Sequence, residues 1–149
     1  MSLTQNLKEL ISACFTGIWV ETHEQFDALQ EIAQLCRDQS WNFASWDIDQ
    51  GLSIETGDGE AQAADPLAAI RSLNGLASTD GTAVLAMKNL HRFISSADIV
   101  QAIERQLISG KQNRTILIAI APSVSIPVEL EKLFVTVDHN LPNLSLIHI

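Results

Sequence analysis

Residues 17–29 of the chain read GIWVETHEQFDAL, and this stretch decides the fold. Its apolar first half predicts a buried strand over 18–21, and its second half predicts a helix from about residue 24. No glycine and no lysine stands between the two. A phosphate-binding loop needs glycines, so that backbone N–H groups can wrap a phosphate, and a lysine that reaches the outer phosphates. Carboxylates at the junction would repel a nucleotide triphosphate; the junction reads Glu21, Thr22, His23, Glu24.

Composition excludes several classes of function. The chain has 149 residues, of which 46% are hydrophobic and 18% charged, so we expect one compact domain with its own core. A net charge of −9 and nine scattered basic residues argue against nucleic acid or an anionic membrane surface as a partner. The sequence contains no run of 18 apolar residues and no basic-then-apolar leader, so a cytoplasmic location is expected.

The rest of the chain alternates helix and strand patterns. We expect helices over 3–13, 24–39, a segment starting at Asp65 and Pro66, 97–108, and a short one over 128–132. Strands are expected over 18–21, 41–48, 82–87, 114–121 and 134–139, and an acidic, mobile loop over 50–64. Strands separated by helices need crossover connections, which favour parallel pairing. The sequence therefore predicts an α/β fold, a three-layer αβα sandwich with a mainly parallel five-stranded sheet.

Two expectations about the core accompany this fold. Phe26, Leu29, Ile32, Ala33 and Cys36 share one face of the helix over 24–39 and are expected to be buried. Cys14 and Cys36 are expected to act as small apolar residues, because no CxxC pair is present to bind zinc. The three tryptophans lack the basic neighbours of a base-stacking surface and are assigned to core packing; they are Trp19, Trp41 and Trp46.

Polar residues follow the predicted strands, and in a parallel sheet they meet at one edge. Glu21, Asp47 and Asp49 could bind a divalent metal there, because hard cations prefer carboxylate oxygens. Acidic residues are also favoured at helix starts for electrostatic reasons, so a purely solvated role is the alternative. His91 could act as a general base, but no nucleophile or acid accompanies it in the sequence, which favours packing of a turn.

Three stretches resemble AAA-type ATPases. TILIAIAPSVSIPVELEKLFVTVDHNLPN (115–143) is similar to their fourth and fifth strands, AVLAMKNLHRF (83–93) stands in place of the Walker B strand, and IWVETHEQFDAL (18–29) in place of the P-loop strand and helix. More closely, residues 5–142 resemble the amino-terminal region of AAA proteins first described as hypothetical reading frames of chloroplasts and cyanobacteria. Phrases similar to 87–94 and 121–132 precede the catalytic module in those proteins.

The resemblance implies which functional positions are altered. The Walker A positions hold Glu21, Thr22, His23 and Glu24, and the Walker B acids are replaced by Lys88 and Asn89. A polar sensor at the end of the fourth strand is replaced by Ala121 and Pro122. Together these changes remove phosphate cradling, magnesium anchoring and activation of water. The resemblance thus implies a degenerate P-loop-type core, similar to RecA and AAA folds, that lacks a P-loop.

From this resemblance we expect a non-catalytic scaffold or interaction domain over residues 1–142, with no cofactor of its own. ATP and Mg²⁺ would be bound by a catalytic AAA module of the parent family, in a bacterial cytosol or a plastid stroma. That module or neighbouring subunits would be the partners, and a homo-oligomer is left open. Residues 143–149 depart from the family pattern, and three origins stay open for them: truncation, an artificial boundary or a genuine short end.

The alternative to an interaction domain is a metal-dependent hydrolase or phosphotransferase that uses the strand-end carboxylates. Weak nucleotide binding without hydrolysis lies between the two, because a helix N-terminus offers N–H groups even without glycines.

Overall fold

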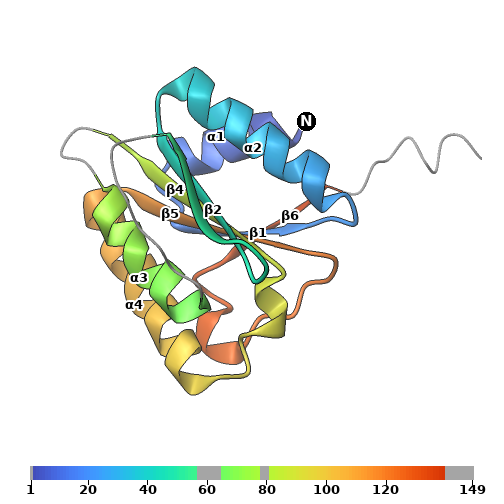
Figure 1. Ribbon diagram of the computed structural model, residues 1–149, viewed down its shortest axis with the longest axis vertical. Coiled ribbons are helices and arrows are strands. Elements are labelled where there is room, and N and C mark those ends of the chain that lie inside the picture. The colour runs from blue at the N-terminus through green and yellow to red at the C-terminus, as the bar shows by residue number, and fades with distance from the viewer. Residues whose placement is uncertain (1, 57–64, 78–80, 140–149) are drawn as a thin grey trace, which may run out of the picture.

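A six-stranded sheet lies between two layers of helices in the computed structural model, which describes residues 2–56, 65–77 and 81–139 (Figure 1). The strands are β1 (Gly17–Glu21), β2 (Asn42–Asp47), β3 (Gly51–Thr56), β4 (Ala83–Lys88), β5 (Thr115–Ala121) and β6 (Val135–Asp138). The helices are α1 (Leu3–Ser12), α2 (Gln25–Gln39), α3 (Pro66–Leu76) and α4 (Ala97–Asn113), with the short 3-10 helices η1 (Leu90–Arg92) and η2 (Val128–Leu130). The α/β sandwich predicted from the sequence is confirmed.

The strand order is β3-β2-β4-β5-β1-β6. Every neighbouring pair is parallel except β2 and β3, which are antiparallel. From β1 the chain crosses three places along the sheet to β2 through α2, which lies on one face, whereas β4 connects to its neighbour β5 through α4 on the other face (Figure 1). The direction of the crossovers changes between β1 and β5. In sheets of this kind, ligands bind beyond the carboxyl ends of the strands at such a point.

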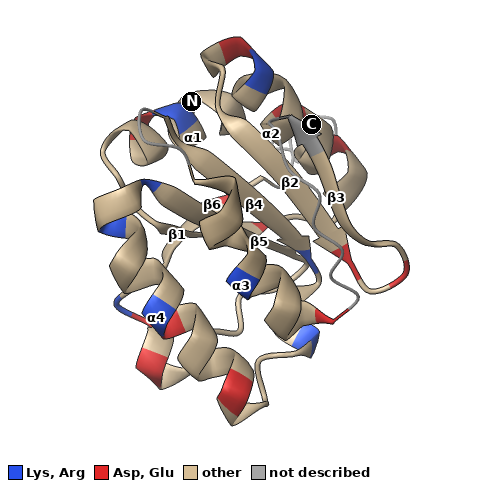
Figure 2. Ribbon diagram, turned by 60° about the vertical axis from the view of Figure 1, so that its left-hand side comes forward, with Lys and Arg blue, Asp and Glu red and all other residues tan. Residues whose placement is uncertain are grey.

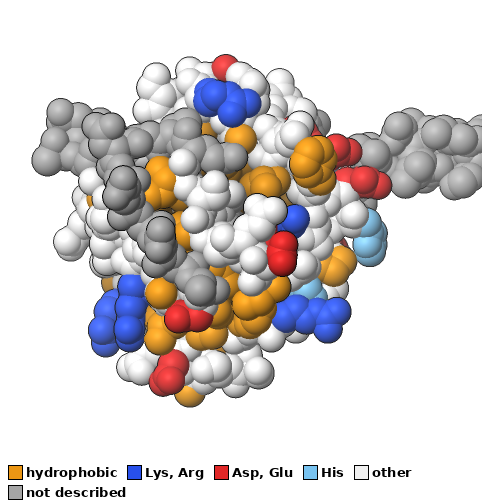
Figure 3. Space-filling view, viewed as in Figure 1, with side chains coloured by type: hydrophobic (Ala, Val, Ile, Leu, Met, Phe, Trp, Pro, Cys, Tyr) orange, Lys and Arg blue, Asp and Glu red, His pale blue; other side chains and the backbone are white. Residues whose placement is uncertain are grey.

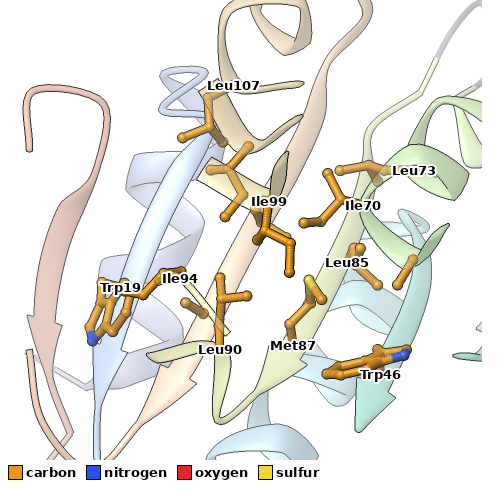
Figure 4. Close-up of a cluster of buried hydrophobic side chains, with 14 of the residues drawn as sticks. Trp19, Trp46, Ile70, Leu73, Leu85, Met87, Leu90, Ile94, Ile99 and Leu107 are labelled. Atoms are coloured by element: carbon orange, nitrogen blue, oxygen red, sulfur yellow. The ribbon is translucent and has the colours of Figure 1, made fainter. Parts of the chain in front are cut away.

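The two faces of the sheet form two separate hydrophobic cores. Ile18 and Val20 of β1 point toward α1 and α2, and Trp19 between them points toward α3 and α4. The second of these cores is shown in Figure 4, where Trp19 and Trp46 lie at opposite ends of a row of aliphatic side chains. Both indoles are fully buried, as expected, and Trp41 is half-buried. Apart from Lys88 and Thr115 at their ends, the central strands β4 and β5 are apolar because helices cover both of their faces.

The sequence predicted five strands and an acidic loop over 50–64, and the structure corrects both. Residues 51–56 form β3, which pairs antiparallel with β2 at the edge of the sheet. Leu52 and Ile54 alternate toward the core, and Gly51 makes the turn with a φ of 75°. The Asp47 side chain closes that turn by accepting the backbone N–H groups of Asp49 and Gln50. The remainder of the predicted loop, 57–64, lies outside the described residues.

Several predicted details of the helices are also wrong. Phe26 is 65% exposed, because it lies in the first turn of α2 beyond the strand ends, and Ala28 and Leu35 are buried on that helix instead. The helix predicted over 97–108 continues to Asn113 in α4, and Arg114 takes the left-handed capping conformation with a φ of 55°. Cys14, which follows α1, is only half-buried, whereas Cys36 is buried as expected.

The predicted helix over 128–132 is reduced to the single 3-10 turn η2. The tail over 143–149 lies outside the described residues. No helix in the described ranges is long and apolar enough to cross a membrane.

Gly17, the first residue of β1, has no room for a side chain. A Cβ there would lie 2.6 Å from the carbonyl oxygen of Leu133 and 2.7 Å from Cδ1 of Leu107. We expect Gly17→Ala to lower the free energy of unfolding by about 1–3 kcal/mol, as overpacking does, measured by urea denaturation. The control is Gly75→Ala on α3, where nothing lies within 4 Å of the new Cβ and stability should stay equal or rise by up to about 1 kcal/mol. Equal unfolding midpoints for Gly17→Ala and the wild type would contradict this packing.

Candidate functional site

The carboxyl ends of the parallel strands meet at one edge, where the sequence predicted any site. At the crossover point this edge consists of the turn between β1 and α2 and the residues that follow β4, β5 and β6. In the turn, Glu21 is half-buried, Thr22 is fully buried, and His23 and Glu24 are exposed. The four residues therefore play different parts, although the sequence placed them together.

Thr22 is the centre of the turn. Its backbone N–H donates to the carbonyl oxygen of Ala121 at 2.8 Å, which ties the turn to the end of β5. Its Oγ1 accepts the backbone N–H of Glu24 at 2.9 Å, which closes the turn before α2. The same oxygen lies 2.9 Å from Nδ1 of His139, just after β6. Groups that a phosphate-binding loop would offer to a ligand thus bind the protein itself.

His139 links the end of β6 to the turn and to α2. Its backbone N–H donates to the carbonyl oxygen of Glu21 at 2.9 Å, and its Nε2 lies 2.7 Å from Oε2 of Glu31. A carboxylate only accepts hydrogen bonds, so Nε2 carries a proton, and in the neutral ring Nδ1 then accepts the Thr22 hydroxyl proton. Glu31 was not among the sequence-predicted site residues, because nothing distinguishes it from other half-exposed helix glutamates.

The series Thr22, His139 and Glu31 has the hydroxyl, imidazole, carboxylate order of hydrolytic triads. A nucleophile must reach a substrate carbon, but Thr22 is 0% exposed, and its oxygen already accepts the Glu24 N–H. This arrangement therefore holds the turn after β1, the residue after β6 and α2 together, and it does not supply a nucleophile.

A second connection crosses the same edge. Nε2 of Gln25, in the first turn of α2, donates to Oδ1 of Asn89 at 2.9 Å. Asn89 follows β4 in a left-handed conformation with a φ of 59°, and its N–H donates to the carbonyl oxygen of Ile120 at 2.7 Å. The residue that follows the predicted Walker A positions is thereby joined across β5 to a predicted Walker B position. Gln25 was missed by sequence reasoning, because a glutamine at a helix start carries no distinguishing signal.

The remaining predicted positions lie beside these two connections. Lys88 ends β4 and is half-buried, and Pro122 follows β5 and is also half-buried. The next residue, Ser123, accepts the indole N–H of Trp19 on its carbonyl oxygen at 3.0 Å. This bond fixes the start of the loop after β5 against the core.

The carboxylates considered as metal ligands are not gathered. Glu21 ends β1, whereas Asp47 ends β2 and Asp49 lies in the turn after it, and β4 and β5 run between these two strands. Three strand spacings correspond to about 14 Å, too far for one ion to bridge. Across the described ranges, no three His, Cys, Asp or Glu side chains come together in a way that could hold a metal ion.

His91 lies in η1, half-buried, and its Nδ1 has no hydrogen-bond partner among the described residues. Burial, and to a smaller extent the neighbouring Arg92, lowers the pKa of His91 below its ordinary value. A neutral imidazole that packs in a turn is the role that the structure gives it.

The fold and this edge define an α/β domain of nucleotide-binding architecture whose first strand-to-helix turn is closed by its own hydrogen bonds. Residues 3–139 match the family described as the SpoVK-like AAA ATPase, N-terminal domain, and the chain belongs to this family. The resemblance to the amino-terminal region of AAA proteins is thereby confirmed.

A solved structure shows the same fold at low sequence identity. A chain in a structure of Drosophila ORC bound to AT-rich DNA and Cdc6 aligns with a TM-score of 0.57 and 12% identity, over 92% of this chain and 52% of that one. A chain from a structure of Drosophila ORC bound to DNA aligns with a TM-score of 0.49 and 12% identity, over 93% of this chain and 87% of that one. This chain thus spans about half the length of the first of them. No curated protein sequence matches it.

Thr22→Val tests the hydrogen bonds of the turn. The substitution keeps the shape of the side chain but removes the hydroxyl. It therefore leaves His139 Nδ1 without its partner in a buried place and the Glu24 N–H without its partner in a part-buried one. We expect the free energy of unfolding to fall by about 1–3 kcal/mol in urea denaturation. The matched control is Thr136→Val on β6, where the threonine is exposed and the change should stay within about 0.5 kcal/mol. A similar, small effect for both variants would show that Thr22 does not hold the turn.

Proposed function

We propose that this chain is a non-hydrolysing interaction domain of an AAA ATPase, and that ATP and Mg²⁺ bind to a catalytic module outside it. The observation that carries the proposal is the direct hydrogen bond between Gln25 and Asn89, which crosses the edge where a nucleotide would lie between the first strand-to-helix turn and the end of β4. Family membership supports an association with AAA ATPases.

The chemistry of the turn supports the absence of phosphate binding. A phosphate is held by backbone N–H groups that point at it. Here the N–H groups of Thr22 and Glu24 donate to Ala121 and to the Thr22 hydroxyl. The carboxylates of Glu21 and Glu24 add negative charge at the same turn, which repels phosphate further.

The end of β4 supports the absence of hydrolysis. Phosphoryl transfer needs carboxylates that hold Mg²⁺ and orient the attacking water. This strand ends in Lys88 and is followed by Asn89, whose amide oxygen is bound to Gln25. Neither Lys88 nor Asn89 carries a carboxylate that could hold Mg²⁺ or orient the attacking water.

Exposed apolar residues support a role in protein contacts. Four of the six large hydrophobic side chains that are most exposed in the described residues belong to segments that leave the carboxyl ends of strands: Phe26, Ile48, Val124 and Val128. Single exposed apolar residues are normal. These four all follow strands at the same edge of the sheet, where a partner protein could contact them. The net charge of −9 does not favour DNA as the partner, although the structural neighbours were solved in complexes with DNA.

Calorimetric titration of the 149-residue chain with Mg-ATP, together with phosphate-release measurements, tests the proposal. We expect no turnover and a Kd weaker than about 1 mM. Glu21→Gln combined with Glu24→Gln should raise any residual affinity, because two carboxylates are removed from the turn. A matched control, Glu129→Gln with Glu131→Gln, removes the same charge from exposed positions in and just after η2. This control should leave the affinity for Mg-ATP unchanged. Tight binding with turnover by the wild-type chain would overturn the proposal.

A further inference from the structure

A hollow of about 490 Å³ lies at the carboxyl ends of β2 and β4, away from the turn that follows β1. One wall is the turn between β2 and β3, with Asp47, Ile48 and Asp49. The other wall is the end of β4 and the residues after it, with Lys88, Arg92 and Phe93. The hollow thus has one acidic and one basic wall. Figure 2 shows red on the turn that joins β2 to β3 and blue at the end of β4.

The charges of the two walls are not used within the chain. Among the described residues, Lys88, Arg92 and Asp49 form no ion pair; the contact between Glu31 and His139 becomes one only when the imidazole is protonated. Oδ1 of Asp47 accepts the backbone N–H groups of Asp49 and Gln50 in the turn that follows β2. Figure 3 shows basic and acidic side chains near one another in the middle of this face, with apolar side chains around them. Charges in this arrangement can pair with a second surface.

One residue of the acidic wall is apolar and projects into solvent. Ile48 is 63% exposed at the turn between β2 and β3. Phe93, on the opposite wall, is half-buried, and its ring meets Trp46 edge-on, with centroids 5.5 Å apart and an interplanar angle of 79°. The aromatic side of the hollow is therefore fixed by the core. The same molecule thus carries a projecting apolar side chain, Ile48, and a hollow whose aromatic wall, Phe93, could contact the Ile48 side chain of a second copy.

A surface that carries both a feature and its complement is self-complementary, which is the requirement of a two-fold symmetric interface. We propose that two copies of this domain pair through the hollow, with Ile48 of each copy in the hollow of the other and Asp49 of each facing Arg92 of the other. A uniformly acidic or basic partner would complement one wall and be repelled by the other. This inference rests on the proposed function and names the partner and the surface of the interaction.

Sedimentation analysis of the 149-residue chain from low micromolar to submillimolar concentration tests the pairing. We expect a reversible dimer that weakens as salt rises, because exposed charge pairs are screened. Ile48→Asp should weaken the dimer at least tenfold. The matched control is Ile108→Asp on α4, an isoleucine that is 57% exposed, and it should leave the dimer unchanged. Thermal melting of both variants shows that each one is folded.

Charge exchange identifies the pairs. Asp49→Lys and Arg92→Asp should each weaken the dimer when alone, because like charges then face each other across both symmetric contacts. An equimolar mixture of the two variants should regain a dimer, since one variant carries two basic walls and the other two acidic walls. The double variant Asp49→Lys with Arg92→Asp should also dimerise by itself.

A chain that stays monomeric at submillimolar concentration would overturn the inference. So would a dimer that Ile108→Asp breaks and Ile48→Asp does not, or charge variants whose mixture remains monomeric. None of these results bears on Mg-ATP. A monomer that fails to bind nucleotide would leave the proposed function standing without this interface, and a dimer that hydrolyses ATP would overturn the proposed function alone.

Discussion

The carboxyl edge of this sheet depends on the hydrogen bonds of one buried threonine. The backbone N–H of Thr22 bonds the end of β5. Its hydroxyl bonds the Glu24 N–H at the start of α2 and the ring of His139, the residue after β6. Its burial makes these bonds hard to replace, because each group would otherwise lose water without gaining a partner. Three neighbouring elements are therefore tied together at a single residue, two of them through its side chain, and Glu31 extends the same link along α2.

A turn held in this way has different uses from a glycine loop. A loop that wraps a phosphate leaves its N–H groups pointing at the ligand, whereas this turn directs those of Thr22 and Glu24 to protein oxygens. The bond from Gln25 to Asn89 crosses the remaining space. Under our proposal, the AAA-type architecture is kept for its surface. The apolar and charged groups at the same edge, from Ile48 to Arg92, then carry the interaction.

The parts of this structure that follow from local sequence could be predicted, and the parts that follow from long-range pairing could not. The apolar runs at β4 and β5 indicate strands covered on both faces, and this prediction is confirmed. The strand β3 was missed because it contains only two large apolar residues, Leu52 and Ile54, within an acidic, glycine-bearing stretch. The bonds from Gln25 to Asn89 and from Glu31 to His139 join residues 64 and 108 positions apart, and the partners are ordinary polar residues with no shared motif.

The central claim is that protein groups, rather than a ligand, satisfy the turn after β1. Hydrogen exchange of the backbone amides of Thr22 and Glu24, resolved by NMR with and without Mg-ATP, tests it most directly. The account predicts that both amides exchange as slowly as those within β1, because both are bonded to protein oxygens, and that Mg-ATP leaves their exchange unchanged. Exchange at the rate of an open loop in the free protein, with protection gained on addition of Mg-ATP, would contradict it.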